Sequence, residues 1–177
     1  TQNGGMVSYI LRSREITETK VKAEEAVKAA QKYLNDLGFT SMKESYYETS
    51  NGICTVNFAY EQDGVIVYPD LIKVSVALDN CDILSMDARG YIMSHTTRNV
   101  GTKISQEEAS KSVSNLLTIE SCYKAIIPTD GENEVLCYEF RTKGSNDEDV
   151  FVYVNAQTGA EEEILMILKG EDGILVK

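Results

Sequence analysis

The amino-acid sequence predicts an α+β fold made of tandem modules, each with one helix packed on an antiparallel β-sheet. The segments Lys22-Ala-Glu-Glu-Ala26 and Ser105-Gln-Glu-Glu-Ala109 both open a helix-like stretch, and they lie 83 residues apart. Cys54 and Cys137 lie in strand-like stretches at the same offset. Self-similarity at a fixed spacing is the signature of a repeated architecture. Each helix-like stretch is followed by short apolar stretches between glycine-containing turns, which is typical of antiparallel strands.

The first predicted element is a helix from Val21 to Leu37. Its apolar residues recur at spacings of three and four, which places them on one face, and Gly38 ends the helix because glycine readily adopts the left-handed conformation of a C-terminal cap. The predicted inward residues are Ala23, Ala26, Val27, Ala30, Leu34 and Leu37.

Five strands follow in the first copy. The turns between them contain Asn51-Gly52 and Asp63-Gly64, which are strong signals for two-residue hairpins, and a third turn covers Asp79–Asp82. Cys81 stands within this third turn at a position that favours glycine, so it either accepts a positive φ or changes the turn. The predicted strands are Met42–Glu48, Ile53–Tyr60, Val65–Tyr68, Lys73–Leu78 and Ile83–Asp87.

The second copy begins with a predicted helix from Gln106 to Leu117. Ser105 and Glu108 have the spacing of a capping box, whereas Lys22 takes the place of Ser105 in the first copy and removes that cap. Turns are predicted at Thr129-Asp130-Gly131 and Thr158-Gly159. The strands are Ile119–Ile127, Glu134–Lys143, Val150–Asn155 and Glu161–Leu168.

The last of these strands contains the segment Ile164-Leu-Met-Ile-Leu168, which is apolar on both faces. Two interpretations are open for this segment. It forms a central buried strand, which is the favoured interpretation, or it presents a patch that docks on another surface.

The N-terminal segment from Asn3 to Arg12 can be aligned with Asn80 to Arg89, a turn followed by a closing strand. The predicted organisation is therefore a closing strand of a preceding copy at 1–16, one module at 17–98 and another at 99–177. A lone terminal strand is poorly held unless it pairs. We expect it to add to a sheet edge in this chain or in another copy, which would allow self-association.

Composition excludes several classes of function. The formal net charge is −11, so a nucleic-acid backbone or an anionic membrane surface would repel the chain. No apolar run reaches the ~18 residues of a membrane span, so we expect no membrane insertion by this segment. The four cysteines lack the close pairs that zinc sites use, and Cys54 and Cys137 are expected to be buried, reduced thiols. No cofactor or metal is expected.

No set of residues predicts catalysis. His95 is the only histidine, so any Cys–His pair would require it, and we interpret it as a linker residue between modules. A pair of carboxylates can hydrolyse glycosides, but acidic residues are abundant here and helix starts and turns account for them. Asp79, Asp82 and Asp87 do not have the spacing of an EF-hand calcium loop.

Arg89, Gly90 and Tyr91 form the candidate partner interface. Glycine allows a bend here, and Arg and Tyr are enriched among the residues that dominate binding energies. Two interpretations stay open: a surface that contacts a partner, or a β-bulge whose Tyr91 packs on its own sheet.

The unit of helix, hairpin and closing strand pair resembles the PepSY module. Three longer segments are similar to the C-terminal PepSY region of the YpeB family of germination proteins from endospore-forming bacteria. They run from Tyr68 to Asn80, from Asp87 to His95 and from Ile127 to Phe140. The resemblance extends from about Gly4 to Glu163.

The resemblance implies a sporulation protein without catalytic activity that acts with the cortex-lytic enzyme SleB. It also implies a position at the outer face of the inner spore membrane, in the cortex region, with anchoring by an N-terminal segment that lies outside this chain. The expected function is to stabilise, localise or restrain that enzyme. PepSY modules also occur in propeptides of thermolysin-like proteases, so a protease inhibitor or folding chaperone is the alternative. An enzyme that acts on peptidoglycan is a third hypothesis.

Overall fold

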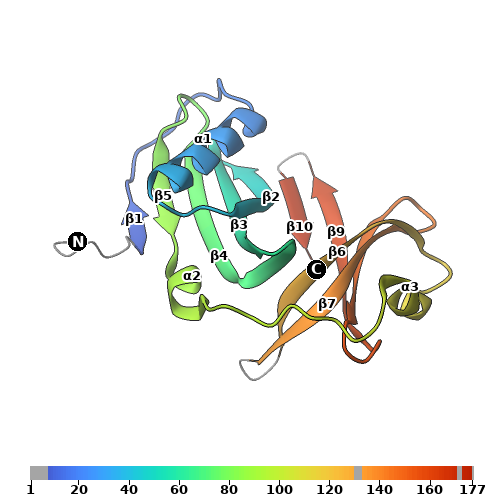
Figure 1. Ribbon diagram of the computed structural model, residues 1–177. Helices are drawn as coiled ribbons and strands as arrows, with labels where there is room; N and C mark the ends of the chain where they lie inside the picture. Colours follow the sequence, from blue (N-terminus) through green and yellow to red (C-terminus); the bar gives the residue numbers. More distant parts are fainter. Residues whose placement is uncertain (1–7, 130–132, 171–172, 177) are drawn as a thin grey trace. The chain divides into compact units, whose positions relative to one another are not determined.

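The computed structural model describes residues 8–129, 133–170 and 173–176, and they form an α+β fold with few helices and a mixed β-sheet (Figure 1). The described residues divide into two compact units, the first made of 8–61, 69–96 and 173, the second of 62–68, 97–129, 133–170 and 174–176. The elements are β1 (Tyr9–Leu11), α1 (Ala23–Asp36), β2 (Met42–Ser50), β3 (Ile53–Gln62), β4 (Val65–Ala77), β5 (Ile83–Asp87), α2 (Arg89–Ser94), α3 (Gln106–Ala109), the 3-10 helix η1 (Ser110–Ser112), β6 (Thr118–Thr129), β7 (Asn133–Lys143), β8 (Asp149–Asn155), β9 (Glu161–Gly170) and β10 (Gly173–Val176).

The strands of the first unit lie in the order β1-β5-β4-β3-β2. β1 pairs antiparallel with β5, with Tyr9 opposite Asp87 and Leu11 opposite Ser85. The N-terminal strand therefore adds to a sheet edge of its own chain, as one of the two predicted arrangements requires.

Helix α1 covers one face of this sheet (Figure 1). Ala26, Ala30 and Leu34 are fully buried against the core, whereas Leu37 is 37% exposed and lies outside it. The small alanines let the helix approach the strands closely. Lys22 caps the helix with its backbone alone, and Gly38 ends it at a φ of +88°, both as predicted.

The two predicted hairpin turns have the backbone of a type I′ turn, in which both central residues take positive φ. Asn51 and Gly52 have φ values of +51° and +74° between β2 and β3, and Asp63 and Gly64 have +51° and +76° between β3 and β4. Cys81 accepts a positive φ of +64° in the third turn. The predicted turn at Asp130-Gly131 lies outside the described residues.

β4 is one continuous strand, whereas the sequence predicts two strands separated by residues 69–72. The strand pairs parallel with β6 through Val65–Val67 and antiparallel with β5 through Lys73–Val76. Pro69 lies between these two paired stretches. The N–H group that proline lacks is therefore not needed in either ladder, and the extended backbone continues through it.

The second unit contains an antiparallel meander of β6, β7, β8 and β9. The predicted helix from Gln106 to Leu117 is wrong in length, because α3 ends at Ala109 and only η1 continues it. The expectation of one full helix in each module is not confirmed. The following residues explain the early end: the Ser110 hydroxyl donates to the Glu107 carbonyl, and the Ser114 hydroxyl accepts from Leu116 N–H. Such bonds compete with the helical backbone. Ser105 accepts from Glu108 N–H, as the predicted cap requires.

Candidate partner-binding surface

The segment Arg89–Tyr91 begins helix α2, so it does not form the β-bulge of the second interpretation. The helix starts directly after β5 because the Asp87 carboxylate accepts the Arg89 backbone N–H at 3.1 Å. The same carboxylate binds the Arg89 guanidinium through two bonds, of 2.9 and 2.6 Å. These bonds hold the pKa of Asp87 below its ordinary value.

The three candidate residues of α2 have different surroundings. The Arg89 side chain is exposed, and its guanidinium lies 5.2 Å from the centre of the Tyr9 ring. Tyr91 points inward and is only 8% exposed, with its ring edge-on to Phe39. A Cβ on Gly90 would lie 3.3 Å from the Leu71 carbonyl, so glycine lets α2 pack closely against β4. Whether this segment contacts a partner stays a prediction, and the side chain best placed to do so is Arg89.

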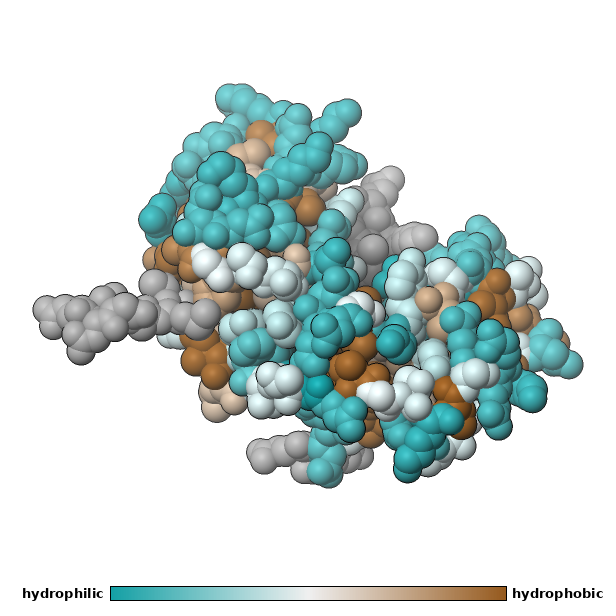
Figure 2. Space-filling view, viewed as in Figure 1, coloured by the Kyte–Doolittle hydropathy of each residue, from teal (hydrophilic) through white to brown (hydrophobic). Residues whose placement is uncertain are grey.

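Exposed apolar side chains lie on β1 and α2, the elements that contribute Tyr9 and Arg89. Leu11 is 66% exposed on β1, and Met93 is 87% exposed on α2. Figure 2 shows apolar side chains in the part of the first unit where Figure 1 draws β1 and α2. We call this the β1–α2 surface, and its members are Tyr9, Leu11, Arg89, Ile92 and Met93.

The backbone of β1 adds to this surface. Ser8 accepts from Ala88 N–H and Arg12 donates to Leu84, so the even-numbered residues of β1 bond to β5. In an antiparallel pair, the residues between them point their N–H and C=O groups the other way. The backbone groups of Tyr9 and Leu11 therefore face the outer edge, because β1 is the terminal strand in the sheet order of the described residues.

His95 follows α2, and both its backbone and its ring make contacts within the first unit. The sequence instead predicts a linker residue at this position. Its backbone N–H donates to the Tyr91 carbonyl, and its Nδ1 lies 2.6 Å from Oδ2 of the fully buried Asp70. Its ring stacks on Tyr91 at 4.3 Å between centroids and meets Tyr60 edge-on. In the described part of the chain, its ring contacts are with an aspartate and two tyrosines, not with a thiol, so the catalytic Cys–His pair is not assembled.

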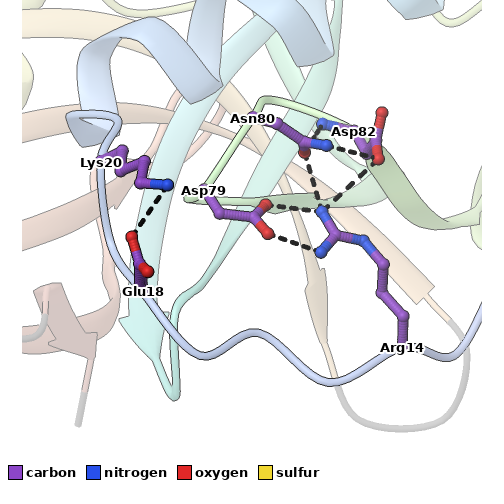
Figure 3. Close-up of polar contacts among 6 residues, drawn as sticks. All are labelled: Arg14, Glu18, Lys20, Asp79, Asn80 and Asp82. Atoms are coloured by element: carbon purple, nitrogen blue, oxygen red, sulfur yellow. Dashed lines mark hydrogen bonds and ion pairs between the residues drawn. The ribbon is translucent and has the colours of Figure 1, made fainter.

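The turn that carries Asp79 and Asp82 is bound by an arginine from the N-terminal segment, which the sequence did not indicate. Figure 3 shows the Arg14 guanidinium pointing into this turn, and it donates to Asp79 at 2.6 Å and to Asn80 at 2.8 Å. These bonds hold the pKa of Asp79 below its ordinary value. The three carboxylates considered for a calcium site therefore form ion pairs with arginines. Arg14 pairs with Asp79 and Asp82, and Arg89 pairs with Asp87.

A groove of 460 Å³ lies in the first unit beside the N-terminal segment and the β1–α2 surface. Leu11 forms part of its wall, and hydroxyl groups of Thr55, Ser75 and Ser85 lie along it on neighbouring strands. The Thr55 and Ser75 hydroxyls are bonded to each other at 3.1 Å. The groove therefore offers hydroxyl groups next to an apolar side chain, and the charged residues Arg12, Arg14 and Glu48 also line it.

The second unit contains a buried polar cluster centred on Glu139, which is fully buried. The Tyr68 hydroxyl donates to one carboxylate oxygen at 2.7 Å, and Arg141 Nε donates to the other at 2.9 Å. The Arg141 guanidinium lies between the rings of Tyr123 and Phe151, at 4.6 and 4.9 Å from their centres. Burial, reinforced by the carboxylate, raises the pKa of Tyr68. The cluster satisfies a buried charge and holds the strands of this sheet in register.

The cysteines have the environment of inert thiols. Cys54 and Cys137 are fully buried, as predicted, and all four cysteines are free. Burial raises the pKa of the Cys54 thiol to about 11 and that of Cys137 to about 12. A nucleophilic cysteine needs the opposite shift, toward the thiolate. These two thiols therefore act as small apolar side chains.

Within residues 8–129, 133–170 and 173–176, no three side chains of His, Cys, Asp or Glu gather where they could hold a metal ion. Across the same part of the chain, none of the helices is both long enough and apolar enough to cross a membrane.

Comparison with known proteins gives two family matches that together cover most of the chain. Residues 1–101 match the family described as YpeB sporulation, PepSY1 and PepSY2 domains. Residues 103–165 match the family described as peptidase propeptide and YPEB domain.

Individual relatives agree with these matches. The chain is 34% identical over 172 residues to the sporulation protein YpeB of Halalkalibacterium halodurans, and 34% identical over 171 residues to that of Oceanobacillus iheyensis. These alignments cover 97% and 96% of the chain but only 38% of each relative, so the chain spans well under half of their length.

A solved structure has the same fold. The Bacillus megaterium YpeB C-terminal domain superposes with a TM-score of 0.85 at 29% identity, covering 94% of this chain and 74% of that one. Because the first family match covers more than half of the sequence, the chain belongs to the YpeB family of sporulation proteins and carries PepSY domains.

Proposed function

We propose that this part of the protein is a non-enzymatic protein-binding module, which stabilises, localises or restrains the cortex-lytic enzyme SleB in the spore. The observation that carries the proposal is the β1–α2 surface, where β1 and α2 expose apolar side chains and Arg89 lies over the Tyr9 ring. Large exposed apolar groups around an arginine are typical of protein interfaces. The relatives are named as sporulation proteins rather than as enzymes, which supports a binding role.

The outer edge of β1 suits this role. An exposed edge can add an extended segment of a partner through main-chain hydrogen bonds, and native edges that avoid such pairing often carry lysine or proline. β1 instead carries Tyr9 and Leu11, which are 48% and 66% exposed. We propose that a partner strand pairs with these two residues while its side chains contact Met93 and Arg89.

The location of the module is part of the same proposal. We place it in the cortex region, at the outer face of the inner spore membrane, held there by an N-terminal segment of the longer protein. The relatives extend well beyond the matched region, so there is room in them for such a segment. Self-association through β1 is the competing use of the same edge.

Binding measurements with the purified chain and SleB test the proposal. Met93→Ser and Arg89→Ala are expected to weaken binding about tenfold or more if these residues are at the centre of the interface. Lys28→Ala, on the exposed face of α1, is the matched control and should leave binding unchanged. Equal binding by all three variants would exclude this surface, and no binding by the unchanged chain would exclude direct contact with SleB by this region.

Crosslinking in spores tests the partner independently. Tyr91 is buried, so the photoreactive residue belongs at position 93, which is 87% exposed. An adduct that contains SleB is expected. An adduct that contains only a second copy of the protein would assign the surface to self-association.

A second function is favoured by one of the family matches, whose description includes peptidase propeptides. In that case the module inhibits a protease or assists its folding. Mixing the chain with a thermolysin-like protease separates the two functions, because binding to the protease but not to SleB would replace the first proposal with the second.

A further inference from the structure

Helix α1 covers one face of the sheet in the first unit, and the opposite face carries short hydroxyl side chains. Cys54, Val56 and Val74 belong to the buried core that α1 packs against. Because successive side chains of a strand point to opposite faces, Thr55 and Ser75 point away from α1. Both are only half-buried. The groove of 460 Å³ therefore lies on the face that α1 does not cover.

The strand register places one residue from each strand of this sheet in a single row. Leu11 is opposite Ser85, and Ser85 is opposite Ser75. The hydroxyls of Ser75 and Thr55 bond to each other, and Thr55 is opposite Glu48. Residues directly opposite each other in antiparallel strands point to the same side of a sheet. The row therefore crosses β1, β5, β4, β3 and β2 in that order, and all of its members line the groove.

The row sets a repeat distance for a ligand. Neighbouring strands lie about 4.8 Å apart, so the row extends over roughly 19 Å. The hydroxyls of Ser85, Ser75 and Thr55 follow one another at this spacing. The spacing is close to the length of one pyranose unit in an extended β-linked glycan. Such a glycan, lying across the strands, can place one sugar over each strand.

The hydrogen-bonding groups of the groove suit a ligand that carries many hydroxyls. A serine or threonine hydroxyl both donates and accepts, and so does the side-chain amide of Asn51. The bond between Thr55 and Ser75 uses one of their two hydroxyl hydrogens, so the other stays available. Sugar hydroxyls also donate and accept, whereas a phosphate or carboxylate only accepts and an ammonium group only donates. The row is therefore complementary to a polyhydroxyl ligand.

Apolar side chains provide the second part of a sugar site. Leu11, Ile53 and Leu84 also line the groove, and they can contact the C–H groups on the faces of pyranose rings. Sites for small ligands combine such apolar contacts with a few polar groups that fix orientation. The volume of 460 Å³ also falls within the range of about 300–1,000 Å³ that is usual for such sites.

The charges of the groove argue against a polyanionic ligand. Arg12 and Glu48 bring one positive and one negative charge to its lining. The Arg14 guanidinium donates to Asp79 and Asn80 in the neighbouring turn (Figure 3), so its charge is already paired. The formal net charge of the chain is −11, which repels a polyanion. A neutral ligand is therefore favoured.

An extended peptide suits this face less well than a glycan. A sheet binds an extended peptide through the main-chain groups of an edge strand. Strands β5, β4 and β3 each have a neighbour on both sides in the sheet order, so their main-chain groups bond within the sheet. Across these strands the groove offers side chains, and their hydroxyls match sugars better than a peptide backbone.

We propose that this hydroxyl-row groove, made of Leu11, Ser85, Ser75, Thr55 and Glu48, binds an extended, neutral, β-linked glycan that lies across β5, β4 and β3. Leu11 is the residue that the groove shares with the β1–α2 surface. The proposal does not depend on binding of SleB, because Met93 and Arg89 do not line the groove.

An NMR titration of the full chain with cellohexaose, an extended β-linked glucose oligomer, tests the proposal. The backbone amide signals of Thr55, Ser75 and Ser85 should shift as the ligand is added. Maltohexaose, the α-linked isomer, curves and cannot keep one ring over each strand. It should therefore bind about tenfold more weakly, which corresponds to the loss of one or two hydrogen bonds.

Removal of the hydroxyls should weaken binding of cellohexaose. The triple variant Thr55→Val/Ser75→Ala/Ser85→Ala should bind about tenfold or more weakly. It should fold, because both partners of the Thr55–Ser75 bond are removed together and neither is left unsatisfied. The single variant Ser85→Ala changes less of the sheet and should weaken binding about two- to tenfold. Ser121→Ala, a half-buried serine on β6 in the second unit, is the matched control and should bind like the unchanged chain.

Several results would overturn the proposal. They are the absence of shifts at the three hydroxyl residues, equal affinity for maltohexaose, or equal binding of cellohexaose by the triple variant. A glycine and serine peptide that shifts the same signals at lower concentration than cellohexaose would assign the groove to peptides instead. Met93→Ser should leave glycan binding unchanged, so a failure of this proposal is distinct from a failure of SleB binding at the β1–α2 surface.

Discussion

Replacing Arg141 with methionine removes the positive charge beside a fully buried carboxylate. Glu139 has no solvent exposure, and Arg141 Nε lies 2.9 Å from it. Breaking a buried ion pair by removing one partner costs about 3–5 kcal/mol, because the remaining charge is uncompensated. The Arg141 side chain is 36% exposed, so water screens part of the attraction, and we expect about 3 kcal/mol. Methionine keeps the apolar contact with Tyr123 and Phe151.

Urea unfolding followed by circular dichroism measures this loss. The double variant Glu139→Gln/Arg141→Met should recover most of it, because a neutral glutamine still accepts the Tyr68 hydroxyl and leaves no buried charge. Lys28→Met is the matched control, since it removes an exposed charge and should change the free energy of unfolding by less than about 0.5 kcal/mol. The reasoning is refuted if Arg141→Met costs under about 1 kcal/mol, or if the double variant is no more stable than the single one.

Three further predictions concern the helix cap, the thiols and the arginine at the third turn. Lys22→Ser supplies the missing cap of α1 and should raise the free energy of unfolding by about 0.5–1 kcal/mol; an unchanged urea midpoint would contradict it. Cys54 and Cys137 should react with a thiol reagent only after urea unfolds the chain, whereas labelling of either thiol at its full rate in the native protein would show that it is accessible. Arg14→Gln should lower the melting temperature at pH 7, and the difference should shrink as the pH falls below 3.8. The sign follows because the pKa of Asp79 is lowered from 3.8 in the folded protein, so its stabilisation exists above that value and is lost as the carboxylate becomes protonated. A difference that does not shrink as the pH falls below 3.8 would mean that Arg14 stabilises the turn without the Asp79 charge.

The local elements of the first unit follow from local patterns. The spacing of apolar residues predicts α1, and the pairs Asn51-Gly52 and Asp63-Gly64 predict their hairpins, because each depends on residues within a few positions. The second helix was overestimated although the sequence contains the reason: Ser110, Ser112 and Ser114 interrupt its apolar spacing, and serine hydroxyls compete for the helical backbone.

The contacts of the candidate surface were only partly predictable. The residue types of Arg89, Gly90 and Tyr91 predict a candidate interface. Residue type alone does not determine which of these side chains points outward. Tyr91 packs inward because α2 lies against β4, and Gly90 permits that approach. The exposure of Tyr9 and Leu11 depends on the pairing of β1 with β5, which no pattern within the N-terminal segment specifies.

The repeat, the turn residues, the first helix and the excess of acidic residues can be predicted from the sequence because they are local or compositional properties. Long-range partners cannot: Arg14 and Asp79 are 65 residues apart, and Tyr68 and Glu139 are 71 apart. Such pairs meet only when strand register and turn direction bring distant segments together. The exposure of Ile164 and Met166, at 50% and 47%, has the same origin, because it depends on which segments pack over their strand.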